Sequence, residues 1–470
     1  MDIDMNSKYE RLLELFEEIS KTPRKSGSEK EIALFVCNFA EKLGLEHSMD
    51  NYYNVIVKRP ADEGMEEKKK LMFQAHLDMV CEKVSDSNHD FSKDPIDIIK
   101  SEGLYTANGT TLGADDGIGV SILLLLMETS DIKLPLTYFV FTTQEETGMA
   151  GAKNIDFNGV DVNYLINLDS EEENSIIVGC AGGVTLYFEK ENHLYDISDP
   201  VYQIEISGLK GGHSGVDIDK NRVNAICLSA KILSALSSVH LISFNGGTKT
   251  NVIPSNSTVV FSTKSENMEE DINSVINNID FCPEDKDLSI SVKKLEGEFQ
   301  GLSELASKEI ISLLLDLQQG VISKADIVET SGNIAIIEMN GEIVKLCESM
   351  RSNVSEQLVN YRDMNITLAD SLGFIIKAGE EYPGWDYNPK SNLIDLYVSA
   401  YQTVHNGEKP IISSIHAGLE CGLLKDKLSD VDIISIGPDV KDVHTPNERL
   451  HLDSCKKLIS TIIEFITKID

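Results

Sequence analysis

Apolar segments of two kinds alternate along roughly the first 170 residues, and this alternation constrains the fold more than any other feature. The run at 136–143 is short and continuously apolar, and those at 70–76 and 164–169 are short and mainly apolar, which predicts three strands. The longer run at 117–130 predicts a buried helix between two of them. Strands that alternate with helices predict an α/β domain whose sheet is flanked by helices.

A further helix is predicted before the first of these strands. Ser28 and Glu31 have the spacing of a capping box, and the apolar residues of 32–44 recur at helical intervals. Gly44 suits the C-terminal end of that helix, because glycine readily adopts the left-handed conformation that follows a last helical turn.

The pattern changes from about residue 186, where short alternating strands and charged helices are separated by polar turns. The buried α/β pattern resumes after residue 384. We therefore expect one α/β domain formed by residues 1–185 and 385–470, interrupted by an inserted α+β lid domain at residues 186–384.

The charge balance excludes some classes of partner. The chain has 42 Lys and Arg against 77 Asp and Glu, a formal net charge of -35, which repels phosphate backbones and anionic membrane surfaces. The first residues are acidic and lack the apolar core of an export signal, and the eight cysteines form no CxxC pair. These features predict a cytoplasmic protein with reduced thiols that binds neither nucleic acid nor membranes.

Acidic and histidine residues gather at five strand or loop ends. These are His76 and Asp78, Asp115 and Asp116, Glu145 and Glu146, Asp169, and His444. Ligand sites in open α/β sheets form at the carboxyl ends of the strands, so we expect these side chains to converge.

Two imidazoles together with several carboxylates are enough ligands for two divalent metal ions, so the sequence predicts a site for two such ions. Two ions roughly 3.5 to 4 Å apart need a carboxylate that binds both, and we assign that role to Asp115. One ion is expected to bind His76 and Asp169, and the other Glu146 and His444. Zinc suits these ligands, and manganese or cobalt could also be bound.

Two further acidic residues are expected to act without binding metal. Asp78 lies two residues after His76 on the same side of the strand, where it can accept the imidazole N–H and fix its tautomer. Glu145, next to the ligand Glu146, is expected to be the general base that takes a proton from water and returns it to the leaving amine.

Each motif has an ordinary structural explanation when it is taken alone. Adjacent glutamates are usually exposed helix residues, a GADDG sequence is usually a turn before a helix, and HTPNE is commonly a loop before a capped helix. The joint occurrence of all five motifs favours the metal site over five separate explanations.

With these residues identified, the sequence resembles the co-catalytic zinc metallopeptidases that include carboxypeptidase G, aminoacylase, peptidase T and carnosinase. The blocks FQAHLDMVCEK, TLGADDGIGV, TTQEETGMAGA, INLDSEE, GLKGGHSGVDI, SSIHAGLECG and HTPNERL carry the resemblance and are spread over nearly the whole chain. The resemblance implies a zinc-peptidase fold, a mixed sheet flanked by helices with an inserted α+β lid. Gly117 stands where the broader family usually has lysine, as in its dipeptidase subgroup.

The resemblance also implies roles for residues of the lid. His213 resembles the lid histidine that stabilises the tetrahedral oxyanion, often in the partner subunit's active site, and Arg351 resembles the arginine that binds the substrate's C-terminal carboxylate. Asn251 and Glu420 are further expected contacts of the substrate, with Glu420 close to the metal ions and the substrate's amino group.

The implied activity is hydrolysis of unblocked dipeptides, including Xaa-His, by a homodimer that associates through the lid. Two alternatives keep the metal site and change the substrate to an N-acyl amino acid or a tripeptide. A third is a metal-binding protein without catalysis, which would have no use for Glu145 beside a ligand. Whether His213 acts in its own chain or in the partner stays open, because an enlarged lid could supply it within one chain.

Overall fold

A computed structural model describes residues 4–325 and 328–470 and divides the chain into two compact units. The first unit comprises the residues up to Gly179, Tyr387–Ser414 and Glu420–Asp470, and the second comprises Cys180–Asp386 and Ile415–Leu419. The expected boundaries lay at 185/186 and 384/385. No sequence pattern had indicated that a five-residue segment, Ile415–Leu419, would group with the second unit while the chain on both sides of it belongs to the first.

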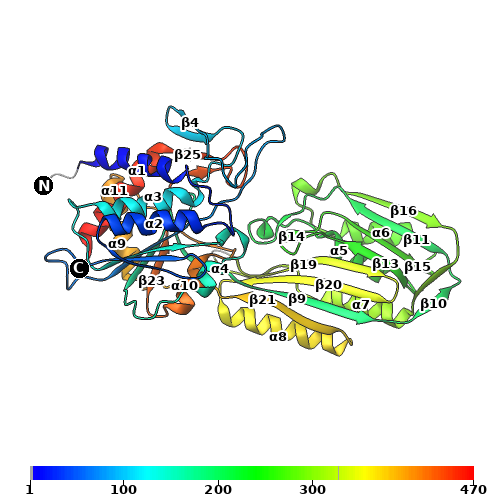
Figure 1. The fold of residues 1–470 in the computed structure, drawn as a ribbon. Coiled ribbons are helices and arrows are strands. Elements are labelled where there is room, and N and C mark those ends of the chain that lie inside the picture. The colour runs from blue at the N-terminus through cyan, green and yellow to red at the C-terminus, as the bar shows by residue number, and fades with distance from the viewer. Residues whose placement is uncertain (1–3, 326–327) are drawn as a thin grey trace. The chain divides into compact units, whose positions relative to one another are not determined.

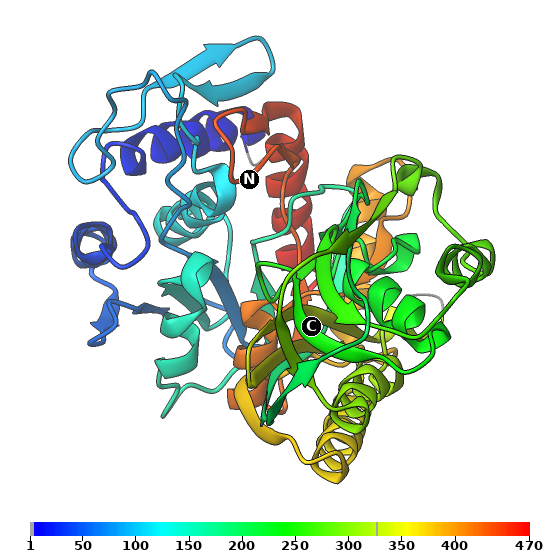
Figure 2. The ribbon, with the colours of Figure 1, turned by 90° about the vertical axis from the view of Figure 1, so that its right-hand side faces the viewer.

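The first unit is built on a sheet that contains both parallel and antiparallel strands. Its order within the described residues is β1-β2-β6-β3-β7-β23-β8-β22, and β6, β3, β7 and β23 run parallel to one another. The strands are β1 (Glu46–Met49), β2 (Val55–Arg59), β3 (Leu71–His76), β6 (Thr137–Thr142), β7 (Tyr164–Asn167), β8 (Ser175–Cys180), β22 (Ile411–Ile415) and β23 (Asp432–Ser435). The smaller strands β4 (Ile98–Ser101), β5 (Leu104–Ala107), β24 (Val440–Lys441) and β25 (Arg449–His451) form a separate sheet, whose β4–β5 hairpin stands apart from the main one (Figure 2).

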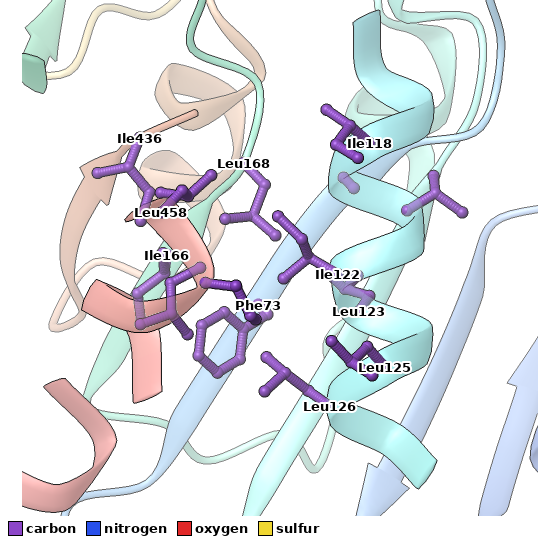
Figure 3. Packing of buried hydrophobic residues seen from close by; sticks show 14 of the residues in the cluster. Phe73, Ile118, Ile122, Leu123, Leu125, Leu126, Ile166, Leu168, Ile436 and Leu458 are labelled. Atoms are coloured by element: carbon purple, nitrogen blue, oxygen red, sulfur yellow. The ribbon is translucent and has the colours of Figure 1, made fainter. Parts of the chain in front are cut away.

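Helices cover this sheet and form one hydrophobic core with it. The helices of this core are α1 (Met5–Ile19), α2 (Lys30–Lys42), α3 (Ala114–Glu128), α9 (Asn392–Val404) and α11 (Leu452–Lys468). The unit also contains the short helices α4 (Ala150–Asn154) and α10 (Glu420–Lys427). Figure 3 shows Ile122 and Leu126 of α3 directed toward Phe73 of β3, with Ile166 of β7 on its other side. The predicted α/β fold with a mixed sheet is confirmed.

One local prediction is wrong. The helix at α2 begins as expected, but its N-cap residue is Glu29, and no side chain caps its first turn, so Ser28 and Glu31 form no capping box. The Glu29 carboxylate turns back to accept the backbone N–H of Gly27 instead, at 2.7 Å. The predicted end is right in kind: Gly44 follows the C-cap residue with a φ of 71°, in the left-handed region.

The second unit is an antiparallel sheet with helices packed on it. Its strand order within the described residues is β16-β11-β15-β13-β19-β20-β9-β21, with β18 paired to β19. The strands are β9 (Gly182–Glu191), β11 (Val201–Ser207), β13 (His240–Gly246), β15 (Ser257–Ser262), β16 (Ser289–Leu295), β18 (Gly320–Lys324), β19 (Val328–Asn340), β20 (Ile343–Ser352) and β21 (Ile375–Tyr382); β10 (Leu194–Ile197) pairs with β17 (Phe299–Leu302), and β12 (Gly212–His213) with β14 (Val252–Ile253).

Four helices share the hydrophobic core of this sheet: α5 (Ala225–Ala235), α6 (Met268–Asn277), α7 (Glu304–Asp316) and α8 (Ser355–Ser371). Helix α8 lies along β9 and β21 (Figure 1). Among the described residues, none of the helices has the length and apolarity needed to cross a membrane.

Candidate metal centre and a second polar cluster

The parallel strands of the first unit bring three of the expected ligands to one edge of the sheet. His76 is the last residue of β3, Asp169 follows the end of β7, and Glu145 and Glu146 follow β6 in a short 3-10 turn, η1 (Glu145–Thr147). Because β3 lies between β6 and β7 in parallel register, their carboxyl ends are adjacent.

Asp115 lies between two imidazoles. Its Oδ1 atom is 3.1 Å from His76 Nε2, and its Oδ2 atom is 3.0 Å from His444 Nε2. Each imidazole nitrogen also faces a second carboxylate: His76 Nε2 is 3.3 Å from Asp169 Oδ1, and His444 Nε2 is 3.0 Å from Glu146 Oε1. One nitrogen that faces two carboxylate oxygens at such distances matches metal coordination better than a single hydrogen bond.

Asp78 is buried behind His76 and beneath the glutamate turn. Its Oδ1 atom lies 3.5 Å from His76 Nδ1, the ring nitrogen that faces away from Asp115. The same carboxylate accepts the backbone N–H of Glu145 at 3.1 Å and that of Glu146 at 3.2 Å. Asp78 therefore holds the turn that presents the two glutamates through hydrogen bonds, and its contact with the imidazole is a longer one, at the limit of hydrogen-bond distance.

Asp116 is a buried acidic residue that the sequence placed among the converging residues without a role of its own. Its Oδ2 atom accepts the backbone N–H of His76 at 3.1 Å, and its carboxylate groups with His76 and Asp169 as possible metal ligands. The adjacent aspartates of the GADDG motif were the available signal, since both lie in the first turn of α3.

Burial of so many acidic groups perturbs their pKa values. Burial raises the pKa of Asp169 to about 8, and burial together with the nearby Asp169 carboxylate raises the pKa of Glu145 well above its usual range. Burial opposes ionisation of Asp115 too, but hydrogen bonds from His444 and His76 outweigh it and lower its pKa. The hydrogen bond with Asp115, followed by that with Glu146, raises the pKa of His444 to about 11.

The residues fit divalent cations. Three groups of side chains each offer ligand atoms within 4.8 Å of one another: His76 with Asp116 and Asp169, His76 with Glu145 and Glu146, and Asp115 with Glu146 and His444. Glu146 Oε1 is buried, and within the described part of the chain its close contact with His444 Nε2, at 3.0 Å, lacks the geometry of an ordinary hydrogen bond. The cluster holds more carboxylates than imidazoles, and bound dications would supply the missing positive charge.

Glu420 is buried below the metal cluster rather than open to solvent. Its Oε2 atom accepts hydrogen bonds from Gln74 Nε2 and Thr142 Oγ1, both at 2.7 Å, and Gln74 Oε1 accepts one from Asn167 Nδ2 at 2.7 Å. This network ties together the ends of β3, β6 and β7. Burial raises the pKa of Glu420 to about 7, and its Oε1 atom has no hydrogen-bond partner among the described residues.

The second unit holds a separate polar cluster that contains the expected lid residues. His213 ends β12, which pairs with β14, and the carbonyl of Asn251 accepts the backbone N–H of Ser214 at 2.9 Å. His213 Nδ1 accepts the backbone N–H groups of Gly215 and Val216, both at 3.1 Å. The ring proton of the neutral imidazole therefore lies on Nε2, which is left as a donor.

Arg351 lies in a row of residues that crosses four strands. In this row Ser331 pairs with Arg351, Arg351 with Gly183, and Gly183 with Tyr382. Arg351 is buried, and its Nη1 donates a hydrogen bond to the Tyr382 hydroxyl at 3.0 Å. Its Nε atom has no hydrogen-bond partner within the residues described, so part of the guanidinium is available to an anion.

His416 is a further histidine of this cluster, and we had not singled it out from the sequence. Its Nε2 atom is 2.7 Å from Ser331 Oγ, and its Nδ1 atom is 2.8 Å from Asn353 Oδ1. Burial, and then the charge of Arg351, lower its pKa to about 4, so the ring is neutral. The HAGLECG block contained the signal, but only Glu420 had been considered in it.

Comparisons with known proteins agree with this geometry. The sequence pattern of the peptidase family M20/M25/M40 matches residues 72–468. The chain is 33% identical to the cytosol non-specific dipeptidase of Escherichia coli (strain K12), over 97% of each chain. Its fold matches a crystal structure of aminoacylhistidine dipeptidase from Vibrio alginolyticus with a TM-score of 0.90 and 30% identity, over 98% of this chain and 96% of that one. Aminopeptidase PepT from Bacillus cereus shares the fold at a TM-score of 0.56 and 18% identity.

Proposed function

Since the chain belongs to the peptidase family M20/M25/M40, it is a peptide-bond hydrolase, and we propose that it is a dipeptidase that uses two divalent metal ions. The proposed substrates are unblocked dipeptides, including Xaa-His, and the proposed ions are Zn²⁺. The observation that carries the proposal is the position of Asp115, whose two oxygens face two different imidazoles, each with a carboxylate of its own.

Bound divalent ions would polarise the scissile carbonyl and make water a stronger acid. His76 and Asp169 are the proposed ligands of one ion and Glu146 and His444 those of the other, with Asp115 shared. Asp78 holds the His76 ring so that Nε2 faces the carboxylates.

Glu145 is the proposed general base. It takes the proton from the attacking water and returns it to the departing nitrogen, so that the amine leaves in neutral form. Its position supports this role, because the turn that holds Glu146 among the ligands also fixes the backbone of Glu145 through Asp78.

The second unit supplies the proposed substrate contacts. His213 donates its Nε2 proton to the oxyanion, and Arg351 binds the C-terminal carboxylate of the substrate. Asn251, beside His213, and the Oε1 atom of Glu420 are proposed as further contacts. The names of the two dipeptidase relatives support a short substrate with a free C-terminus over an N-acyl amino acid or a tripeptide.

A substrate panel tests the proposal. Purified metal-loaded protein is offered a free dipeptide, its N-acetyl derivative, its C-terminal amide and the corresponding tripeptide. The free dipeptide should be hydrolysed fastest, and Xaa-His dipeptides should be among the substrates. Faster hydrolysis of the N-acetyl compound or the tripeptide would contradict the assignment and favour a deacylase or a tripeptidase.

A cytoplasmic homodimer that associates through the lid is proposed as the working form. Support comes from the acidic composition and from the cytosolic name of one relative. Mixing His213→Ala subunits with Glu145→Gln subunits under exchange conditions tests a shared site. If His213 acts in the partner, every mixed dimer contains one site with both defects and one site with neither, and activity partly returns. Absence of recovery despite exchange would show that His213 acts within its own chain.

A further inference from the structure

The segment that carries Asp115 is held on one side by a distant carboxylate. Glu448 Oε2 accepts the backbone N–H groups of Leu112 at 2.8 Å and Gly113 at 2.9 Å, while Oε1 accepts those of Ala114 at 2.7 Å and Asp115 at 3.3 Å. The N-cap residue of α3 is Gly113, which has no side chain to satisfy these donors. Glu448 thus replaces a local cap with one from the other end of the chain.

The opposite side of the segment is held by Arg24. Its Nη2 donates to the carbonyl of Gly113, and its Nη1 donates to the carbonyls of Leu77 at 3.2 Å and Asp78 at 3.1 Å. Arg24 is 2% exposed, so this guanidinium is held in the interior of the first unit. The peptide groups of Gly113 are therefore bound by Glu448 through N–H and by Arg24 through C=O.

Space for this arginine depends on Gly117. A Cβ atom at that position would lie 2.5 Å from Arg24 Nη2 and 3.1 Å from the ring of Phe16. Gly117 is the position where the resembled family usually has lysine. In this chain a glycine at that position leaves room for a buried cation, the guanidinium of Arg24, which comes from another part of the sequence.

Arg24 and Glu448 together join three segments that carry proposed metal ligands. Arg24 links the segment of His76 and Asp78 to that of Asp115, and Glu448, four residues after His444, links the Asp115 segment to the His444 loop. We propose that Arg24 and Glu448 are positioning residues that hold Asp115 between His76 and His444, so that one carboxylate serves both metal ions. This inference rests on the proposed metal site.

The physical reason is that a shared carboxylate must face two ions at once. A small rotation of the Asp115 backbone would shift its two oxygens relative to His76 and His444, so loss of either support would weaken metal binding at both positions. Groups that orient metal ligands typically contribute 10- to 100-fold to metal affinity. Arg24 and Glu448 also have opposite charges, so the two buried groups together add no net charge to the interior.

Arg59 provides a matched control. It is a buried arginine of the same unit, and its Nη1 likewise donates to a main-chain carbonyl, that of Leu126, at 2.8 Å. Arg59 lies on β2 opposite Thr137, at the start of β6, whereas Glu145 and Glu146 follow the other end of that strand. Replacement of Arg59 should therefore affect stability without affecting the metal ligands.

The experiment measures Zn²⁺ affinity by competition with a chelating dye, and the visible absorption of the Co²⁺-loaded protein, for Arg24→Met, Glu448→Gln and Arg59→Met. The first two should bind Zn²⁺ about 10- to 100-fold more weakly and change the Co²⁺ spectrum, which reports ligand geometry. Arg59→Met should leave both unchanged, even where its melting temperature falls as far as theirs. Arg24→Lys, which keeps the charge but loses the forked donor, should lie between wild type and Arg24→Met.

Unchanged Zn²⁺ affinity and Co²⁺ spectra in folded Arg24→Met and Glu448→Gln would overturn the inference, and so would equal losses in Arg59→Met. If the Met and Gln variants do not fold, Arg24→Lys decides the question by the same two measurements. If the wild-type protein does not bind two ions, both the proposed metal site and this inference are rejected. If the wild type binds two ions and the variants bind them equally well, only the inference is rejected.

Discussion

The polar clusters of the two units have opposite electrostatic character. In the first unit, the ends of parallel strands collect the carboxylates of Asp115, Glu145, Glu146 and Asp169 around two imidazoles. In the second unit, the polar cluster contains a cationic guanidinium and neutral donors, with Arg351 beside the Tyr382 hydroxyl. A crowded set of carboxylates suits cations, whereas buried donors suit an anionic group of a substrate.

The backbone explains why the clusters differ. Parallel strands end together, and each is followed by a loop, so side chains after several strands converge on one point. In the antiparallel sheet of the second unit, residues in register form a row across the strands, which positions Ser331, Arg351 and Tyr382 side by side. Metal binding should therefore depend on the first cluster alone, and substrate recognition should depend strongly on the second.

Glu145→Gln should have the largest kinetic effect. Removal of a general base lowers kcat by about 10²- to 10⁴-fold, and metal content should not change because Glu145 is not a proposed ligand. Steady-state kinetics at saturating metal, together with metal analysis of the same sample, check both parts. A variant with near-normal kcat would exclude Glu145 as the base.

His213→Ala should come next, with a loss of about 10²- to 10³-fold in kcat, typical for removal of one oxyanion donor. Metal content should stay at the wild-type value, because His213 belongs to the second cluster. His213 Nδ1 accepts two backbone N–H groups. His213→Asn is a useful second variant, because the amide of asparagine offers both an acceptor for these groups and a side-chain donor. Loss of metal without loss of kcat would contradict the separation between the clusters.

Arg351→Ala should weaken kcat/KM for dipeptides by about 1.5 to 3 kcal/mol, the range for a hydrogen bond to a charged group. Dipeptide amides, which lack the carboxylate, should be poor substrates of the wild type and should lose little further activity in the variant. Comparison of both substrates with both proteins isolates the interaction. Equal losses on dipeptide and amide would remove Arg351 from this role.

Glu348→Gln should leave activity unchanged and alter only the pH dependence of stability. Glu348 lies in the core of the second unit, where Asn365 Nδ2 donates to both of its oxygens at 3.0 and 2.9 Å. Burial raises its pKa from 4.5 to about 8, so the folded state keeps a proton that the unfolded chain releases. The contribution of Glu348 to stability should therefore fall as pH rises through this window, by at most about 1.4 kcal/mol per pH unit.

Urea unfolding at several pH values between 5 and 8 measures this slope, which Glu348→Gln should flatten. Glu189→Gln is the matched control, since Glu189 is exposed on the same sheet and pairs with Lys345 at 3.8 Å. A wild-type slope that survives in Glu348→Gln would assign the pH dependence to other groups.

Local patterns were sufficient to indicate the α/β fold and several of the residues that meet near Asp115, because His76, Glu146 and Asp169 stand at or just after the ends of apolar strands and Asp115 stands at the start of a buried helix. They were not sufficient for Arg24 and Glu448, whose partners are main-chain groups 53 to 336 positions away in sequence. Nearly every residue has the same backbone N–H and C=O groups, so the sequence does not indicate which of them a distant side chain will bind. The capping box of Ser28 and Glu31 was wrong because the N-cap residue of α2 is Glu29, one position later, and no side chain caps the first turn.

The central claim is that Asp115 is shared by two metal ions, and metal counting tests it most directly. The wild type, Glu145→Gln and Asp115→Ala are stripped with chelator, titrated with Zn²⁺ and analysed for bound metal per chain. We predict two ions in the wild type and in Glu145→Gln, and loss of metal together with activity in Asp115→Ala. Two tightly bound ions in Asp115→Ala, or saturation of the wild type at a single ion, would contradict the account.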